Sequence, residues 1–143
     1  MMSRIGNFVA RAPWLTLDQA MIVARLATAG FFVAHAVGRI VLGTIPQFGL
    51  FMETLGFPAG VVVVWIITAT ELVAGLLMIL GRHVRWAALA LFSIAFGGIV
   101  LIHARLGWWV GEHGTGGSEY SVALIMLLLL VAAHDAERSR TRV

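Results

Sequence analysis

The chain has 143 residues, of which 60% are hydrophobic and only 12% are charged, whereas an average soluble domain is about half apolar and about a quarter charged. This composition excludes a typical water-soluble globule, and it excludes disorder, which needs low hydrophobicity and high net charge. The formal charge of +3 does not indicate nucleic-acid binding, because all ten basic residues are arginines that lie mostly in short segments between long apolar runs.

The apolar runs predict an all-α polytopic membrane protein with one four-helix transmembrane domain over residues 17–135. A helix that crosses a bilayer needs about 20 residues at a rise of about 1.5 Å each. Residues 1–16 then form a cytoplasmic or interfacial N-terminal segment, and residues 136–143 form a basic cytoplasmic tail. The predicted spans are Leu17 to Leu42, Ala59 to Leu80, Val84 to Leu106, and Glu119 to Ala133.

The first predicted span carries signals for its start and for its packing. Thr16 and Gln19 have the S/T-x-x-E/Q spacing of a capping box, and Gly43 and Gly81 fall where the first two spans should stop. Small residues recur every fourth position along this span, a spacing that lets a neighbouring helix approach closely. These small residues are Gly30, Ala34 and Gly38.

The loop between the first two spans is predicted to contain a short helix of its own. Pro46 can open this helix and Gly56 can close it, and large apolar side chains between them recur at i, i+3, i+4 and i+7. We expect either an interfacial helix held by its apolar face or a lid over the outer end of the bundle. The apolar side chains are Phe48, Phe51, Met52 and Leu55.

The arginines predict the orientation of the spans, because cytoplasmic loops carry the excess of basic residues. Seven of them lie before the first span, between the second and third spans, or after the fourth. The two opposite loops, Gly43 to Pro58 and Gly107 to Ser118, contain none. We therefore expect both termini in the cytoplasm. The seven arginines are Arg4, Arg11, Arg82, Arg85, Arg138, Arg140 and Arg142.

Several ionisable residues lie inside the predicted spans, where a charged side chain costs about 2.5–3.5 kcal/mol on insertion scales and is a functional candidate. Glu71 lies near the middle of its span, so it must be protonated or pair with a cation, either Arg25 in a structural ion pair or Arg39. Depth and helical geometry predict a polar column in the outer half of the bundle that binds a ligand. The column consists of His35, Arg39, Glu71, His103 and Glu119.

Structural roles are alternatives for each of these residues. A buried ion pair can fix helix packing, and His35 can hydrogen-bond a neighbouring helix. His103 can reach water, and Glu119 is favoured by the dipole at a helix start. His35 and His103 could also ligate haem b from two helices. No metal site is predicted, because the spacing of His103, His113 and Glu119 matches no closed site.

In their order and their placement on four spans, these motifs resemble the DoxX/DoxD family of small four-helix bacterial membrane proteins. The resemblance implies an inner-membrane protein linked to redox chemistry, since family members include the small membrane subunit of a thiosulfate:quinone oxidoreductase. Arg39 stands where the family often has lysine, and His134-Asp135 replaces the more usual Ser-x-Asp ending. The matching positions are Arg25, His35, Gly38, Arg39, Glu71, Gly75, Gly81, and Gly116 to Tyr120.

We therefore expect a multi-pass protein of the bacterial inner membrane that is associated with oxidoreductase chemistry and binds a quinone or a similar small ligand in the outward-facing polar column. Arginine and histidine can hydrogen-bond quinone oxygens, and a buried carboxyl group can exchange the accompanying proton. If the chain belongs to an enzyme, it is a subunit of a quinone-linked oxidoreductase. Two alternatives stay open: a non-catalytic anchor or assembly module for a partner oxidoreductase or a second copy of the chain, and a small-solute transporter.

Overall fold

The computed structural model describes residues 14–111 and 116–141, and within these ranges the protein consists of helices and connecting turns without a strand. Four helices are long and apolar enough to cross a membrane. The structure thus confirms the predicted all-α fold with four candidate transmembrane helices. In chain order the elements are α2 (Leu17–Val41), α3 (Ile45–Thr54), α4 (Gly60–Ile79), α5 (Val84–Leu101), the 3-10 helix η1 (His103–Leu106) and α6 (Glu119–Arg140).

The predicted signals at the helix ends are confirmed. Thr16 Oγ1 accepts a hydrogen bond from the Gln19 amide at 3.2 Å, and Gln19 Oε1 accepts one from the Thr16 amide at 2.9 Å, so the capping box of α2 is formed. Gly43 and Gly81 follow α2 and α4 with φ angles of 65° and 68°. This left-handed conformation suits glycine and ends a helix.

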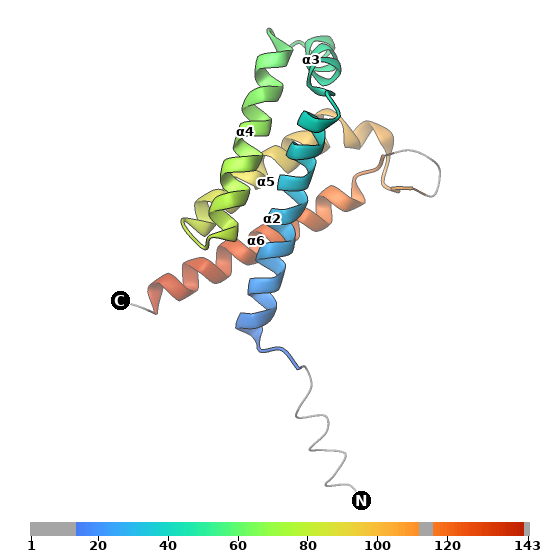
Figure 1. Cartoon of the computed structure of the whole chain (residues 1–143). Coiled ribbons are helices and arrows are strands. Elements are labelled where there is room, and N and C mark those ends of the chain that lie inside the picture. The colour runs from blue at the N-terminus through green and yellow to red at the C-terminus, as the bar shows by residue number, and fades with distance from the viewer. Residues whose placement is uncertain (1–13, 112–115, 142–143) are drawn as a thin grey trace, which may run out of the picture.

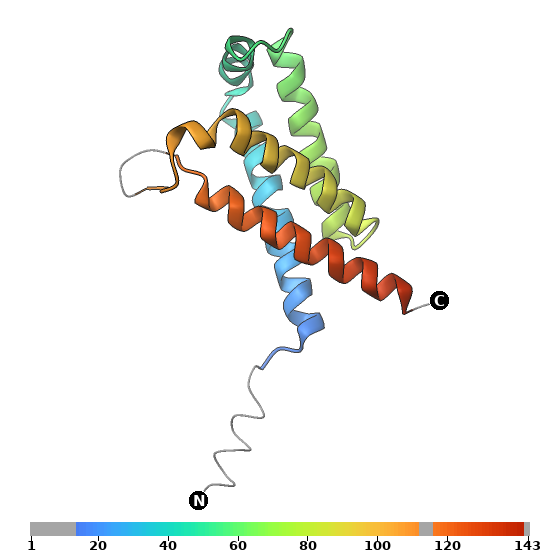
Figure 2. The same ribbon diagram turned by 180° about the vertical axis from the view of Figure 1, so that it is seen from behind.

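The long helices form two antiparallel pairs that cross each other (Figure 1). α2 packs against α4 and α5 packs against α6, while α4 also contacts α5 and α2 also contacts α6. Seen from behind, α5 and α6 lie side by side and pass in front of α2 (Figure 2). The main core lies between the pairs and includes Ala29, Phe32, Met78, Leu91 and Leu128.

The short helix α3 is present as predicted and packs against the start of α4. Two glycines allow this close approach, because a Cβ atom on Gly60 would clash with the carbonyl oxygen of Gly49. Of the predicted apolar stripe, Met52 is buried, Phe48 is half-buried and Phe51 is exposed. Met52 joins Ile45 and Val64 in a second small core, so α3 is held to the bundle by its own apolar face.

Two of the predicted spans differ from the observed helices at their ends. α5 stops at Leu101, where the backbone turns at Ile102 (φ −124°, ψ −64°) into η1, so His103 follows the third long helix and is not part of it. α6 continues beyond Ala133 to Arg140. The apolar run marks only the part of a helix that suits lipid, and polar residues can extend the same helix past it.

The two ends of the bundle carry different polar groups. α3, η1 and the start of α6 lie at one end, which we call the α3 end. The start of α2, the turn between α4 and α5, and the end of α6 lie at the other (Figure 1). We call it the arginine end because it carries Arg82, Arg85, Arg138 and Arg140.

Much of the apolar surface faces outward. Trp65 and Ile66 on α4 are 49% and 61% exposed, and Leu130 on α6 is 55% exposed. Large apolar side chains exposed along all four long helices, each able to span a membrane by length and composition, are expected where lipid replaces water as the solvent. The protein is therefore a membrane protein whose helices contact the lipid bilayer.

Candidate functional site

A buried ionic network joins α2 to α4 near the α3 end. Arg39 Nη1 lies 2.9 Å from Glu71 Oε2 and donates a second hydrogen bond to Thr68 Oγ1 at 2.6 Å, while Arg39 Nη2 reaches Glu71 Oε1 at 3.5 Å. Arg39 is 8% exposed and Glu71 is 3% exposed. The guanidinium group and the carboxylate thus face each other in a two-point contact, which is the strongest geometry for such a pair.

Neighbouring elements hold the network in place. Thr68 lies three residues before Glu71 on the same face of α4, and its hydroxyl donates to the Val64 carbonyl at 2.8 Å while it accepts from Arg39. The ring of Phe48 on α3 covers the Arg39 guanidinium at 5.5 Å from its centroid. Thr68 is a member of the site that was not predicted, although its i, i+3 spacing to Glu71 was a usable signal.

The ion pair predicted between Arg25 and Glu71 is not found in the described part of the chain, where Glu71 pairs with Arg39 instead. α2 and α4 run antiparallel, and Arg25 precedes Arg39 by about 21 Å along α2. Arg25 therefore lies level with the turn after α4, where its Nη1 atom would be 2.8 Å from a Cβ atom placed on Gly81. Helical periodicity gives the face of a residue but not its depth relative to a neighbouring helix, so the sequence left this choice open.

His35 lies one turn before Arg39 on α2 but is exposed. The small-residue face beside it is open within this chain, since a Cβ atom added at Gly30 or Gly38 would meet no atom within 4 Å. His35 therefore belongs to the edge of the network and not to its buried part.

His103 and Glu119 occupy separate positions at the α3 end. The His103 ring lies over Gly98, and its buried Nδ1 has no hydrogen-bond partner among the described residues. Glu119 Oε1 accepts a hydrogen bond from the Val110 amide at 3.0 Å, which ties the loop after η1 to the start of α6. No hydrogen bond joins either residue to the Arg39–Glu71 pair within the described ranges. The five-residue column and its ligand stay a prediction.

The haem site proposed for His35 and His103 stays a prediction, with one imidazole exposed on α2 and the other half-buried after α5. Within residues 14–111 and 116–141, no cluster of three or more His, Cys, Asp or Glu side chains could hold a metal ion. His113, which the sequence analysis considered as a metal ligand, lies outside the described residues.

Two hollows in the structure lie away from the network. A groove of about 410 Å³ runs between α4 and α5, and apart from Thr70 and His83 it is lined by apolar side chains such as Val73, Leu77 and Trp86. A small cavity of about 30 Å³ lies at the arginine end between α2, α5 and α6. Neither of these hollows is lined by Arg39 or Glu71.

Comparison with known proteins gives one family. The family model described as DoxX matches residues 20–104, which cover α2 apart from its first three residues and the whole of α3, α4 and α5. The match includes Arg25, His35, Arg39, Glu71 and His103. The match confirms the resemblance found in the sequence, and Glu119 and α6 lie outside it. No curated protein and no solved structure matches the chain.

Proposed function

This chain belongs to the DoxX family, and we propose that it serves as a non-catalytic membrane anchor or assembly module whose buried polar residues hold its own helices together. The proposed site of assembly is the open small-residue face of α2, and the proposed partner is the same face of a second copy. An oxidoreductase subunit would be held at the membrane through such an assembly, in line with the redox association that the family resemblance implies.

This proposal rests on the Arg39–Glu71–Thr68 network, whose polar groups form their hydrogen bonds with one another. Both carboxylate oxygens of Glu71 accept bonds from Arg39, and the guanidinium group is further engaged by Thr68 and covered by Phe48. A group that binds a ligand keeps donors or acceptors free for it, whereas a network that satisfies itself fixes the packing of two helices. The network is therefore better suited to structure than to ligand exchange.

The face of α2 formed by Gly30, Ala34 and Gly38 supports the assembly role. Ala34 is exposed, and the space beside Gly30 and Gly38 is empty within this chain. Small residues at this spacing let two membrane helices approach closely. In contrast, Val33 of α2 fills the space beside Gly75 of α4. The small size of Gly75 therefore allows a contact between helices of the same chain.

Replacement of Gly30 and Gly38 by isoleucine tests the assembly role. We expect the double variant to lose self-association in lipid vesicles while its unfolding temperature stays that of the wild type, because a Cβ atom at either position meets no atom of the described chain within 4 Å. Since the chain has no cysteine, Ala34→Cys can report association by disulfide cross-linking. Equal cross-linking with and without the two isoleucines would contradict the proposal.

Quinone binding is a second candidate, and the exposure of His35 beside the ionic network favours it. A quinone arriving from the lipid could accept a hydrogen bond from His35, which lies one turn before Arg39 of the buried network on α2. Binding of a short-chain ubiquinone analogue to the purified protein would be the measurement. The candidate predicts that His35→Ala abolishes binding without lowering the unfolding temperature, and absence of binding to the wild-type protein would contradict it.

The orientation is also a proposal, with the arginine end in the cytoplasm of a bacterial cell. Arg82, Arg85, Arg138 and Arg140 lie at that end, and basic residues favour the cytoplasmic side. Single cysteines can be introduced at the exposed residues Gln47 on α3 and Ser139 on α6. An impermeant maleimide added to whole cells should label Gln47→Cys alone, and labelling of Ser139→Cys alone would reverse the orientation.

A further inference from the structure

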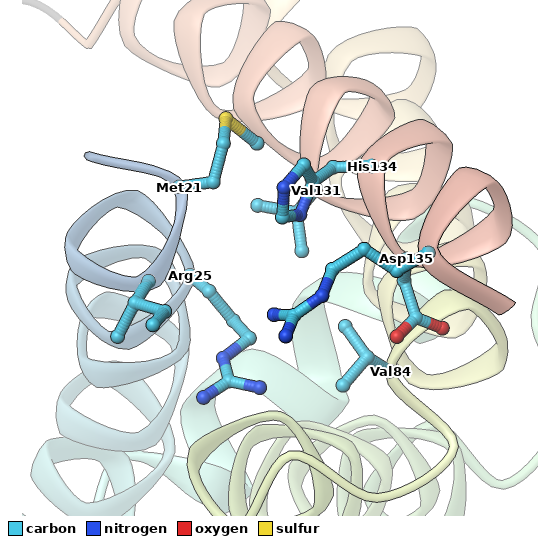
Figure 3. A pocket seen from close by; sticks show the side chains of 8 residues that line it. Met21, Arg25, Val84, Val131, His134 and Asp135 are labelled. Atoms are coloured by element: carbon cyan, nitrogen blue, oxygen red, sulfur yellow. The ribbon is translucent and has the colours of Figure 1, made fainter. Parts of the chain in front are cut away.

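The small cavity at the arginine end contains basic groups that the ionic network does not use. It has a volume of about 30 Å³ and lies where the start of α2, the start of α5 and the end of α6 meet. In Figure 3 the Arg25 side chain of α2 lies on one side of this space, and His134 and Asp135 of α6 lie on the other. Arg138 also lines the cavity, so two arginines from different helices share it.

Arg25 lacks a protein counter-ion in the part of the chain that the structure describes. The two salt bridges there are Arg39–Glu71 and the contact between His134 and Asp18. The Nε atom of Arg25 is buried and has no hydrogen-bond partner within residues 14–111 and 116–141. An unpaired buried donor of a charged group is rare and indicates a missing partner such as an ion or water, and an arginine inside a membrane helix normally finds a counter-charge.

The nearby carboxylates do not supply that partner. Asp135 Oδ2 accepts a hydrogen bond from the Arg85 amide at 3.2 Å, and Asp18 Oδ1 lies 2.8 Å from His134 Nε2. Among the described residues, Asp135 is the only acidic one that lines the cavity, against the two arginines. The cavity thus has an excess of positive charge.

We propose that this cavity binds the phosphate group of an anionic phospholipid between Arg25 and Arg138. A cavity of about 30 Å³ has room for about two water-sized atoms, so it can take the two free oxygens of a phosphodiester. Guanidinium groups bind such oxygens in pairs. The apolar remainder of the lining, with Met21, Ile22 and Val84, suits a phosphate that carries a lipid more than a freely soluble one.

The position of the cavity fits the headgroup layer of a membrane. Trp86 is exposed at the same end, and the Arg85 guanidinium lies 5.1 Å from the centre of its ring. Tryptophan and arginine gather at the level of the lipid headgroups. Arg25 lies about 12 Å along α2 from its first residue, and a long arginine side chain can reach from that depth towards the headgroups.

Lipid retention by the full chain tests the proposal. The protein, purified in a neutral detergent, is mixed with phosphatidylglycerol or with zwitterionic phosphatidylcholine, and bound lipids are counted by native mass spectrometry. We expect Arg25→Gln and Arg138→Gln each to weaken phosphatidylglycerol binding roughly fivefold, the effect of about 1 kcal/mol per arginine at a membrane surface. Arg140→Gln is the matched control, because Arg140 is exposed on the same helix end and does not line the cavity.

A second measurement separates a lipid from a soluble anion. If inorganic phosphate raises the unfolding temperature of the wild type but not of Arg25→Gln, relative to chloride at equal ionic strength, the phosphate site is supported and its ligand is soluble. If only phosphatidylglycerol does so, the ligand is the lipid. Phosphatidylglycerol binding that is unchanged in both cavity variants would overturn the proposal. Arg138 is exposed, so its variant still gives this result if Arg25→Gln does not fold.

Discussion

Two arginines of α2 lie at opposite ends of the bundle and differ in their hydrogen-bond partners. Arg39 is buried at the α3 end with its guanidinium group bound to Glu71 and Thr68. Arg25, at the arginine end, lines a cavity with an Nε atom that has no partner in the described chain. The same side chain on the same helix therefore serves helix packing in one place and is available to a ligand in the other.

Replacing each of the two arginines in turn should give the largest difference in the free energy of unfolding. We expect Arg39→Leu to lower the free energy of unfolding by about 3–5 kcal/mol, because it leaves Glu71 buried without its cation. Arg25→Leu should lower it by about 1 kcal/mol or less in detergent without anionic lipid. Chemical unfolding of both variants in the same detergent is the measurement. Equal losses would mean that the two arginines have the same role.

The next largest difference in stability is expected between the face of α2 that packs against α4 at Val33 and the open face at Gly30. A larger side chain at Gly75 must displace Val33, so Gly75→Leu should cost about 1–3 kcal/mol of stability as an overpacked contact. Gly30→Leu meets no atom of the chain within 4 Å at its Cβ position and should change stability by less than about 0.5 kcal/mol. Thermal unfolding of the two variants checks this, and a destabilised Gly30→Leu would show that the open face is already used within the chain.

A comparison of alanine variants at two turn glycines distinguishes the effect of backbone strain from the effect of a contact with Arg25. Gly43 and Gly81 have nearly the same φ, 65° and 68°, so alanine at either position should cost about 1 kcal/mol from the left-handed conformation. Only at Gly81 would the new Cβ also press on the Arg25 guanidinium. Gly81→Ala should therefore weaken phosphatidylglycerol binding and Gly43→Ala should not. Unchanged lipid binding in both would place the ligand away from Arg25.

His35 gives the smallest expected effect. Because the side chain is exposed and makes no hydrogen bond in the described chain, we expect His35→Ala to change the unfolding free energy by less than about 0.5 kcal/mol. Circular dichroism during thermal unfolding is sufficient. A loss similar to that of Arg39→Leu would make His35 a structural part of the network.

The sequence predicted the helices well because their signals are local. The capping box of Thr16 and Gln19, the stop at Gly81 and the short helix after Pro46 all depend on residues within one or two turns. The break at Ile102 was not predicted, since the apolar run continues to Leu106 without a local stop signal. Gly97 and Gly98 weaken the end of that helix, which is the one hint that the sequence contains.

The site was less predictable because it depends on how two helices are aligned along their axes. The choice between Arg25 and Arg39 as partner of Glu71 follows from the contact between α3 and α4 and from the length of the first loop. Glu119 lies at a helix start, as expected of an acid, but its bond from the Val110 amide joins two residues nine positions apart in the sequence. Such contacts between segments cannot be obtained from the periodicity of a single helix.

A double-mutant cycle on Arg39 and Glu71 tests most directly whether the buried network holds α2 to α4. The unfolding free energies of Arg39→Gln, Glu71→Gln and the double variant are measured in one detergent, with Thr70→Val as a control next to Glu71. We predict that the double variant is less destabilised than the sum of the two single variants, with a coupling of about 1–3 kcal/mol. Additive single effects, or two single variants as stable as the wild type, would contradict the structural role of the pair.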